Sequence, residues 1–344
     1  MTADVDVLVA GGGPVGLAAA IEARLAGLSV LVYEPRTTPL DKACGEGLMP
    51  GAVRALARLG VRPAGREFYG IRYVDSAAAV EHRFRSGPGL GVRRTALHAA
   101  LSARAAELGV RVESRRVDAV RADATGVSVS AGGVQGRWLL GCDGLHSLVR
   151  RDLGLAGPGV PVVRYGVRRH YRLQPWSDVV EVHWSPAGEA YVTPVGDELV
   201  GVAVLGARGL DYAEVVSAAP QLRDRLRGAP VGSELRGAGP LWQTTSRRTR
   251  GRALLVGDAA GYVDALTGEG IRLGLAQARA AVAAIVRDDP AAYERDWRRL
   301  SRYYRLLTTM LVGAATRPAL RRRIVPVAAR LPGLYGALVE RLAQ

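Results

Sequence analysis

The sequence predicts an α/β fold in which one lobe has a parallel sheet, an antiparallel β-sheet is inserted into that lobe, and helices close the chain. Three observations predict it. A glycine-rich loop directly follows a buried strand near the N-terminus, alternating β segments fill residues 160–206, and helical patterns return over 272–315. A run of strands set between alternating strands and helices is typical of a two-lobed α/β protein.

The composition is that of a globular protein with an excess of positive charge. At 344 residues the chain is long enough for a large core and two lobes. Hydrophobic residues make up 48% and charged residues 23%, as in ordinary soluble domains, while the formal net charge is +15. Lys42 is the only lysine, and the arginines are scattered rather than gathered into one tract with aromatic residues. We therefore expect anionic small-molecule ligands and no nucleic-acid partner.

The cysteines and the N-terminus indicate a cytoplasmic protein. Cys44 and Cys142 lie far apart, so a disulfide framework is not expected. Asp4 and Asp6 stand where a signal peptide would be basic or apolar, and no uncharged apolar run reaches the ~20 residues of a membrane helix. No group of side chains has metal-ligand spacing, so no metal site is expected.

The first glycine-rich loop has the spacing of a dinucleotide-binding fingerprint. Residues 5–10, VDVLVA, predict a buried strand, and GGGPVG then opens a helical stretch. Gly11, Gly13 and Gly16 follow the G-x-G-x-x-G pattern, whose glycines allow a tight turn, close approach to a pyrophosphate and close helix–strand packing. A second strand ends at Glu34, which is placed to accept ribose hydroxyls. The sequence thus predicts a Rossmann-type lobe with phosphates at its first helix N-terminus.

The rest of the chain divides between this lobe and a sheet. A helical pattern over 93–108 and strand-like pieces up to Cys142 continue the lobe. The runs RYGVRRHYRL, VVEVHWS, EAYVTPV and ELVGVAVLG, separated by hairpin-length loops such as SPAG and GDE, predict an antiparallel sheet. We expect a discontinuous Rossmann-type lobe at residues 1–65, 93–159 and 251–290. A substrate-facing β domain is expected at 66–92 and 160–250, and a C-terminal helical segment at 291–344. The tail contains two prolines and is expected to be broken helix at best.

A second glycine-rich loop, GDAAGYVDALTGEGI at 257–271, lies between an apolar run and a helical stretch. With GGGPVG and CDGLHSLVR (142–150) it makes three ordered segments in which a strand leads into glycine or aspartate and then a turn or helix. In this order they resemble the fingerprints of FAD-dependent enzymes of the aromatic-hydroxylase class, the group A flavoprotein monooxygenases, and of their geranylgeranyl-reductase-like relatives. The resemblance covers nearly the whole chain.

The resemblance implies a single FAD, extended so that both glycine loops hold the same molecule. The first loop takes the pyrophosphate, Asp258 binds the ribityl chain, and the helix opening at GEGI points its N–H groups at the pyrimidine edge of the flavin. Arg94 matches a helix arginine that reaches the FAD phosphate or ribityl region, or is a surface arginine. Asp143 matches an aspartate between the flavin and nicotinamide sites, or only forms a turn. The expected FAD contacts are Gly11, Gly13, Pro14, Gly16, Glu34, Pro35, Arg36, Arg94, Asp143, Gly257, Asp258, Gly268, Gly270 and Ile271.

Some features are closer to one branch of this superfamily. Gly261 and Glu269 stand where many hydroxylases have histidine and glutamine, whereas the late loop and KACGEGLMP (42–50) resemble the geranylgeranyl-reductase branch. EAYVTPVGDELVGVAV (189–204) resembles a strand pair that faces the substrate cavity in both branches. The chain is also similar to small actinobacterial flavoproteins that accompany type III polyketide synthases, which implies phenolic lipids or quinone precursors as substrates.

Two reactions follow from the resemblance, and the sequence leaves both open. In the first, NAD(P)H reduces FAD, O₂ adds to give a flavin C4a-hydroperoxide, and a phenolic or polyketide-derived substrate, lipid-like ones included, is hydroxylated. In the second, reduced FAD delivers hydride to a prenyl or polyene double bond. Because there is only one dinucleotide fingerprint, NAD(P)H is expected to bind transiently. A flavin-binding scaffold without turnover is the non-enzymatic alternative.

The alternation of side chains along the predicted strands indicates candidate catalytic residues. Glu181 and His183 share one face of VVEVHWS, and Tyr191 lies in EAYVTPV. His183 and Tyr191 are candidates to polarise a phenol, and the alternatives are a solvent-facing histidine and a core-edge tyrosine. Cys44 is a candidate proton donor beside the flavin, or merely a small residue that fits. His170, in the arginine-rich RRHYR, is expected at the surface.

Residues 317–344 carry an apolar stripe at helical spacing, interleaved with arginines: Leu320, Ile324, Val327 and Leu331. One interpretation is a helix packed on the protein's own surface with its arginines solvated. The other is that the tail covers the cavity mouth and meets anionic headgroups at a membrane surface. Pro326 and Pro332 argue against the second interpretation because they divide the stripe into short pieces.

Overall fold

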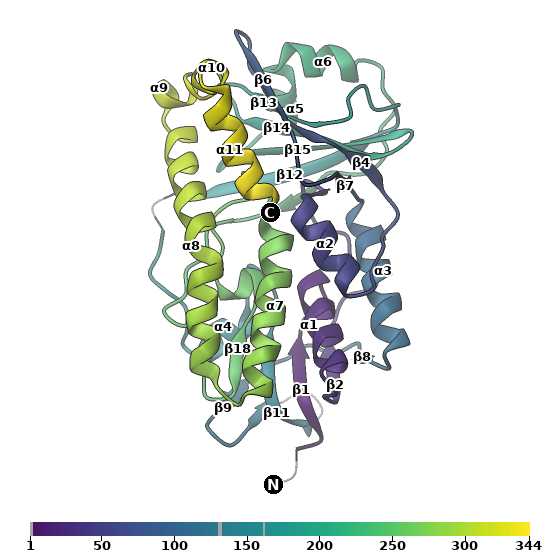
Figure 1. Ribbon diagram of the computed structural model, residues 1–344, viewed down its shortest axis with the longest axis vertical. Helices are drawn as coiled ribbons and strands as arrows, with labels where there is room; N and C mark the ends of the chain where they lie inside the picture. Colours follow the sequence, from purple (N-terminus) through teal and green to yellow (C-terminus); the bar gives the residue numbers. More distant parts are fainter. Residues whose placement is uncertain (1–2, 130–132, 161) are drawn as a thin grey trace.

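Three sheets organise the chain. The computed structural model describes residues 3–129, 133–160 and 162–344. Figure 1 shows a long molecule with the first sheet and its helices in the lower half and a second, seven-stranded sheet in the upper half. A small third sheet consists of three strands in the order β3 (Gly47–Leu48), β7 (Gly89–Gly91) and β4 (Arg66–Phe68).

The first sheet is parallel in its centre. Strand β1 pairs in parallel with β2 and β11, β11 pairs in parallel with β18, and β2 does so with β8. The central strands are short runs of Val, Leu and Ala that are buried on both faces, as parallel strands between helices must be. All their carboxyl ends therefore meet at one edge. The strands are β1 (Val5–Ala10), β2 (Val30–Tyr33), β8 (Arg111–Glu113), β11 (Gln135–Gly141) and β18 (Ala253–Leu255), with β9 (Val120–Ala122), β10 (Val127–Val129) and β17 (Thr249–Arg250) added antiparallel.

Helices cover this sheet and bury its apolar faces. Helix α1 packs against α3 and α7, and α7 packs against α8. The largest apolar cluster joins these helices to the sheet and includes Tyr293 and Trp297 of α8. The helices are α1 (Pro14–Leu25), α2 (Pro50–Arg58), α3 (Arg94–Glu107), α7 (Gly270–Val286) and α8 (Pro290–Ala315).

The second sheet has the order β16-β12-β15-β14-β13-β5-β6. The loops at 185–188 and 197–198 join β13 to β14 and β14 to β15 as antiparallel neighbours, as expected from the sequence. One pair departs from the expected antiparallel sheet, because β5 runs parallel to β13. These two strands are about a hundred residues apart in the chain, so no hairpin fixes their direction. The strands are β5 (Gly70–Val74), β6 (Ala79–Arg83), β12 (Arg164–Tyr171), β13 (Val180–Trp184), β14 (Glu189–Gly196), β15 (Leu199–Ala207) and β16 (Arg236–Ala238).

The C-terminal tail is divided into three helices, in agreement with the broken helix that the sequence predicts. Helices α9 (Pro318–Arg321), α10 (Ile324–Arg330) and α11 (Pro332–Ala343) follow α8. Pro332 does not break a helix but begins one, because the first helical position needs no backbone N–H donor. Helix α11 then returns to the centre of the molecule, where Tyr335 Oη donates to the Ile71 carbonyl at 3.0 Å. None of the described helices is long and apolar enough to span a bilayer.

Candidate functional site

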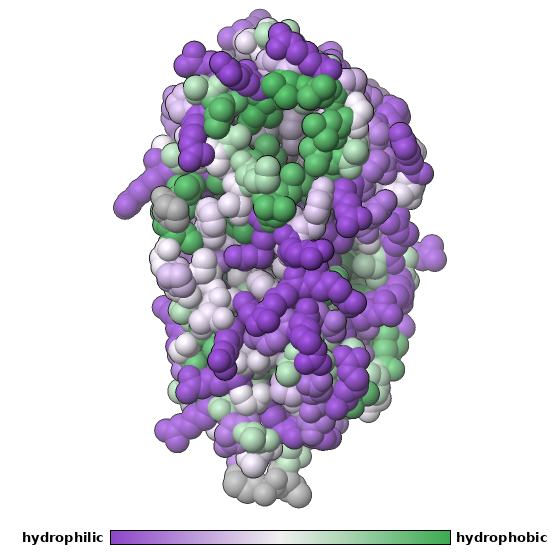
Figure 2. Space-filling model, turned by 60° about the vertical axis from the view of Figure 1, so that its left-hand side comes forward, coloured by the Kyte–Doolittle hydropathy of each residue, from purple (hydrophilic) through white to green (hydrophobic). Residues whose placement is uncertain are grey.

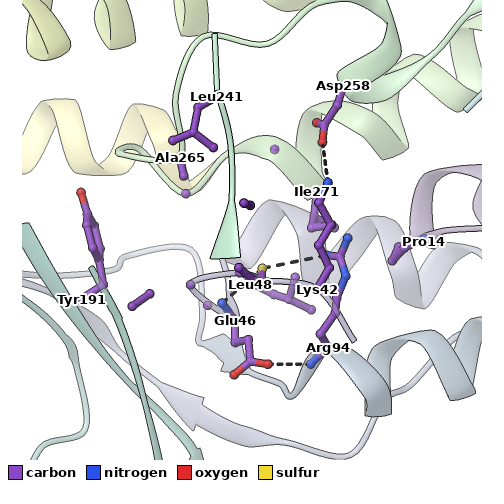
Figure 3. Close-up of a pocket in the computed structure, with 18 of the residues that line it drawn as sticks. Pro14, Lys42, Glu46, Leu48, Arg94, Tyr191, Leu241, Asp258, Ala265 and Ile271 are labelled. Atoms are coloured by element: carbon purple, nitrogen blue, oxygen red, sulfur yellow. Dashed lines mark hydrogen bonds and ion pairs between the residues drawn. The ribbon is translucent and has the colours of Figure 1, made fainter. Parts of the chain in front are cut away.

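A cavity of about 450 Å³ lies at the carboxyl edge of the parallel sheet and reaches the second sheet. Its walls include Gly13 and Pro14 from the first glycine loop, Asp258 from the late loop, and Tyr191 from β14. Figure 3 shows Pro14 and Asp258 on one side of this space and Tyr191 on the other. Ligands of open α/β sheets bind in this position, outside the carboxyl ends of the strands.

The first loop leaves room for a phosphate group. A Cβ added at Gly16 would lie 1.9 Å from the Gly11 carbonyl oxygen, so only glycine allows α1 to start this close to the strand. A Cβ added at Gly13, by contrast, meets nothing within 4 Å and faces the cavity. The N-terminus of α1 has no side-chain cap and no acidic residue in its first turn. Its free N–H groups and partial positive charge therefore fit a pyrophosphate.

Glu34 shapes the loop from the end of β2. Its Oε2 accepts from the Gly12 backbone N–H at 2.9 Å, and its Oε1 accepts from Arg36 Nε at 2.7 Å. Although burial opposes it, these hydrogen bonds from Arg36 and Gly12 hold the pKa of Glu34 below its usual value. Arg36 lines the cavity, whereas Glu34 and Pro35 do not. Glu34 is thus an ionised carboxylate beside the first glycine loop, where a ribose would lie.

The late loop closes the other end of the cavity. The short 3-10 helix η2 (Gly257–Ala260) follows β18, and the Gly257 N–H donates to Gln277 Oε1 at 2.8 Å. Gly268 has a positive φ of 69°, which lets the chain turn into α7 at Gly270. Gly268, Gly270 and Ile271 all line the cavity. A second helix N-terminus without a side-chain cap therefore faces the same space.

Arg94, Cys44 and Glu46 form one cluster at the floor of the cavity. The Arg94 backbone N–H donates to Glu46 Oε1 at 2.8 Å, and Arg94 Nη1 lies 3.9 Å from Cys44 Sγ. The Glu46 backbone N–H approaches the same sulfur at 3.4 Å (Figure 3). All three line the cavity, so Arg94 is not a free surface arginine and Cys44 is next to the expected flavin site.

Asp143 has a clear structural role in addition to its position in the cavity wall. Its Oδ2 accepts from the backbone N–H groups of Leu148 at 2.7 Å and Val149 at 3.1 Å, at the start of α4 (Leu148–Asp152). Its Oδ1 is buried and has no partner among the described residues. Burial raises the pKa of this carboxyl, and hydrogen bonds only partly oppose the shift. Asp143 therefore holds the turn at the start of α4 from its place in the cavity wall.

The wall that faces the second sheet is apolar. It is made by aromatic and aliphatic side chains of several strands and of the segment after β16: Phe68, Ile71, Tyr73, Val180, Val182, Leu205 and Leu241. Tyr191 Oη donates to the Leu266 carbonyl at 2.9 Å, and Thr193 Oγ1 donates to the Gly45 carbonyl at 2.7 Å, so these two hydroxyls are already bonded. Burial raises the pKa of Tyr191 well above its usual value, so its phenol stays protonated.

Two histidines differ from expectation. His183 does not line the cavity, because β13 turns Val180 and Val182 toward it and places His183 on the opposite face, where its Nε2 lies 3.1 Å from Glu181 Oε2. The proposal that His183 polarises a substrate is therefore wrong. His170 was expected at the surface but is fully buried, with its Nε2 2.6 Å from Glu46 Oε2. Carboxylates of the 41–46 loop pair with polar side chains of β12 and allow these side chains to point into the protein.

Sequence reasoning missed several residues of the cavity wall. Lys42 pairs with Asp258 there, and its isolation as the only lysine was the available signal. Val339 and Leu342 of α11 also line the cavity, and nothing in their local pattern indicates this. Among the described residues no group of three or more His, Cys, Asp and Glu side chains is placed to hold a metal ion.

The comparison with protein families identifies the class. The FAD binding domain family matches residues 4–184, more than half of the chain. The chain therefore belongs to this family, and FAD is its cofactor, as the two glycine loops and helix N-termini around one cavity suggested.

Named relatives act in several kinds of metabolism. The chain is 33% identical to dialkyldecalin synthase of Streptomyces rugosporus over 79% of this chain and 63% of that protein. It is 31% identical to menaquinone reductase of Mycolicibacterium smegmatis over 86% and 80%, and 30% identical to rifampicin monooxygenase of Streptomyces venezuelae over 79% and 62%. The chain thus spans less than two thirds of the length of two of these relatives.

The fold is that of solved flavin monooxygenases. The structure of p-nitrophenol 4-monooxygenase from Pseudomonas putida superposes with a TM-score of 0.82, covering 100% of this chain and 99% of that one, at 19% identity. At this identity the likeness describes the fold alone, and it confirms the α/β architecture with an FAD-binding lobe.

Proposed function

We propose that this chain is an NAD(P)H-dependent FAD monooxygenase that hydroxylates a phenolic or polyketide-derived substrate, lipid-like ones included. Bound FAD supplies the redox chemistry, taking hydride from NAD(P)H and activating O₂. The observation that carries the proposal is that the FAD-facing end of the cavity continues directly into an apolar wall. Such a wall excludes water and accepts a flat, apolar ring.

The roles of this chain's residues follow from that cavity. The N-terminus of α7 at Gly270 and Ile271 presents N–H groups and partial positive charge, which stabilise negative charge on the reduced cofactor. Tyr191 stays protonated, so it cannot act as a base, and its O–H can donate to a phenolic oxygen only by leaving the Leu266 carbonyl. Cys44, beside Arg94 in the cavity wall, is the candidate proton donor for the flavin reaction.

The similarity to rifampicin monooxygenase supports oxygenation rather than any particular substrate. NAD(P)H would bind transiently at the open side of the cavity, since only one G-x-G-x-x-G loop is present.

Reduction of prenyl or polyene double bonds is the alternative function. It is favoured by the similarity to menaquinone reductase and by the apolar residues Val339 and Leu342, with which α11 extends the cavity wall. A cavity of this kind also accepts a hydrocarbon chain. In this alternative Cys44 would supply the proton that accompanies hydride transfer.

One experiment separates the two reactions. The FAD-loaded protein is mixed with NADH or NADPH, isotopically labelled O₂ and a panel of phenolic polyketides and prenylated quinones, and the products are analysed by mass spectrometry. We expect a product with one labelled oxygen atom and no product under anaerobic conditions. Saturation of a double bond without labelled oxygen would replace the proposal by the reductase. FAD that neither nicotinamide cofactor reduces would exclude both and leave a binding scaffold.

A further inference from the structure

The C-terminal helices expose an unusual number of large apolar side chains. Leu306 and Met310 in α8 are 60% and 64% exposed, Leu331 just before α11 is 50% exposed, and Leu334 in the first turn of α11 is 56% exposed. We call these residues, with Leu320 and Val327, the C-terminal apolar patch. Figure 2 shows apolar side chains gathered around a hollow on the upper part of the face over α8 to α11, with hydrophilic side chains at its rim. A contiguous patch of this kind marks an interaction surface.

The spacing of these residues places them on helix faces that nothing covers. Leu306 and Met310 are one turn apart in α8, and Arg302 lies one turn before them on the same face. Buried residues of α8, such as Tyr304 and Thr308, lie on the opposite side and pack inward. The apolar patch is therefore additional to the face that packs α8 against the protein.

The charge around the patch is almost entirely positive. From Ser301 to Gln344 the chain has eight arginines and a single acidic residue, Glu340, which pairs with His82. Six of these arginines are exposed and form no ion pair with a described residue: Arg302, Arg317, Arg322, Arg323, Arg330 and Arg341, the last of which stacks on the Tyr303 ring. Exposed leucines beside unpaired arginines are typical of a surface that binds membranes. The leucines enter the edge of the hydrocarbon layer, and the arginines contact anionic headgroups.

The patch is connected to the cavity through α11. The first turn of this helix carries exposed Leu334, and its last turns carry Val339 and Leu342, which line the cavity. Tyr335 anchors the helix between these two regions through its bond to the Ile71 carbonyl. A surface bound at the patch would thus lie against the helix that forms the cavity wall.

We propose that the C-terminal apolar patch and its arginines dock this protein on the surface of an anionic phospholipid bilayer. The apolar side chains enter the interface, and Arg322, Arg323 and Arg330 contact lipid phosphates. The docking is peripheral, and it does not depend on which reaction the protein catalyses.

The test is sedimentation of the FAD-loaded protein with vesicles of phosphatidylglycerol and phosphatidylcholine, compared with vesicles of phosphatidylcholine alone. We expect binding to the anionic vesicles that weakens as salt is raised, and little binding to the neutral ones. Leu331→Ser with Leu334→Ser, and separately Arg322→Gln with Arg323→Gln, should each lower the partition coefficient by about tenfold or more. Leu25→Ser with Leu235→Ser, and separately Arg62→Gln with Arg116→Gln, make the same chemical changes at other exposed positions and should leave it unchanged.

The FAD content and elution volume of every variant serve as controls for folding and assembly. Absence of binding to anionic vesicles at low salt overturns the proposal, as does equal binding by the patch variants and their controls. A wild-type protein that is a dimer, becomes a monomer on Leu331→Ser with Leu334→Ser, and ignores vesicles would assign the patch to self-association instead. None of these outcomes depends on hydroxylation or reduction, so the proposed function is tested separately.

Discussion

Lys42 Nζ lies 3.6 Å from Asp258 Oδ2, and this contact joins the 39–46 loop to the late glycine loop at the cavity. Both side chains are about one third exposed, so the pair adds little to the stability of the fold, at most ~1 kcal/mol. Its position among the residues expected to hold the middle of FAD indicates that it orders the site for the cofactor rather than the fold.

Replacing Lys42 therefore tests cofactor binding. We expect Lys42→Met to weaken FAD binding about tenfold, equivalent to ~1.4 kcal/mol, while Lys42→Arg keeps most of the affinity because it keeps the charge. Arg62→Met is the control, since Arg62 is exposed on another loop. Fluorescence titration of apoprotein with FAD measures the three dissociation constants. Identical constants for Lys42→Met and the wild type would show that the pair has no part in binding.

Tyr191→Phe tests the hydrogen-bond donor in the apolar wall. The variant should keep its FAD and lose about 1 kcal/mol of stability, because the Leu266 carbonyl loses its partner. If Tyr191 orients the substrate, less product should form per NAD(P)H oxidised. Tyr69→Phe, at an exposed tyrosine, is the matched control. Unchanged coupling in Tyr191→Phe would remove this tyrosine from the proposed mechanism.

A buried charge network ties the tail to the second sheet. Glu189 accepts from Arg321 Nη2 and from Arg164 Nη2, both at 2.7 Å, and Arg164 Nε lies 3.1 Å from Asp264 Oδ2. Removing one partner leaves a buried carboxylate poorly compensated, so Arg321→Met should destabilise the protein by about 3 kcal/mol or more. The exposed neighbour provides the control, and Arg322→Met should change stability by less than ~0.5 kcal/mol. Equal unfolding midpoints in urea for the two variants would contradict the role of the network.

The late loop makes the fold sensitive to pH. Burial raises the pKa of Glu269 from 4.5 to about 7, although Arg272 opposes the shift. Between these two pKa values the carboxyl group of the unfolded chain has lost the proton that the folded protein still holds. The free energy of unfolding therefore falls as the pH rises from 4.5 to about 7, and then levels off. Glu269→Gln removes this loss of stability. The melting temperature of the variant minus that of the wild type should therefore be larger at pH about 8 than at pH about 5. Glu198→Gln, at an exposed turn, should show no such trend. A pH-independent difference for Glu269→Gln would show that Glu269 is ionised throughout.

The sequence predicted the central elements because their signals are local. The runs at 5–10 and 253–256 are continuous apolar segments next to glycine, and they form β1 and β18 within a residue of the expected bounds. The short helices α5 (Tyr212–Ser217) and α6 (Pro220–Leu226) were not predicted, since so few residues carry a weak periodicity, whereas α2 was missed although its apolar residues have a clear helical spacing. The parallel pairing of β5 with β13 has no local signal at all.

Site residues could be predicted where residue type and sequence spacing together indicate a function, as in the first glycine loop. They could not be predicted as well where the contacting residues are far apart in the chain. Parity correctly placed Glu181 and His183 on one face of β13, but parity cannot say which face meets the cavity. His170 lies in a polar run, and its burial depends on Glu46, which is 124 residues away in the chain. Proline in the tail was ambiguous because it either breaks a helix or begins one.

The central claim is that both glycine loops hold the same FAD in one cavity, and calorimetric titration of the apoprotein with FAD tests it most directly. We predict one FAD per chain for the wild type. Gly13→Val should bind none while keeping the wild-type melting curve, because its side chain fills space that no protein atom occupies. Gly159→Val changes an exposed glycine with equally open surroundings and should bind as the wild type does. Two FAD molecules per chain, or full binding by Gly13→Val, would contradict the account.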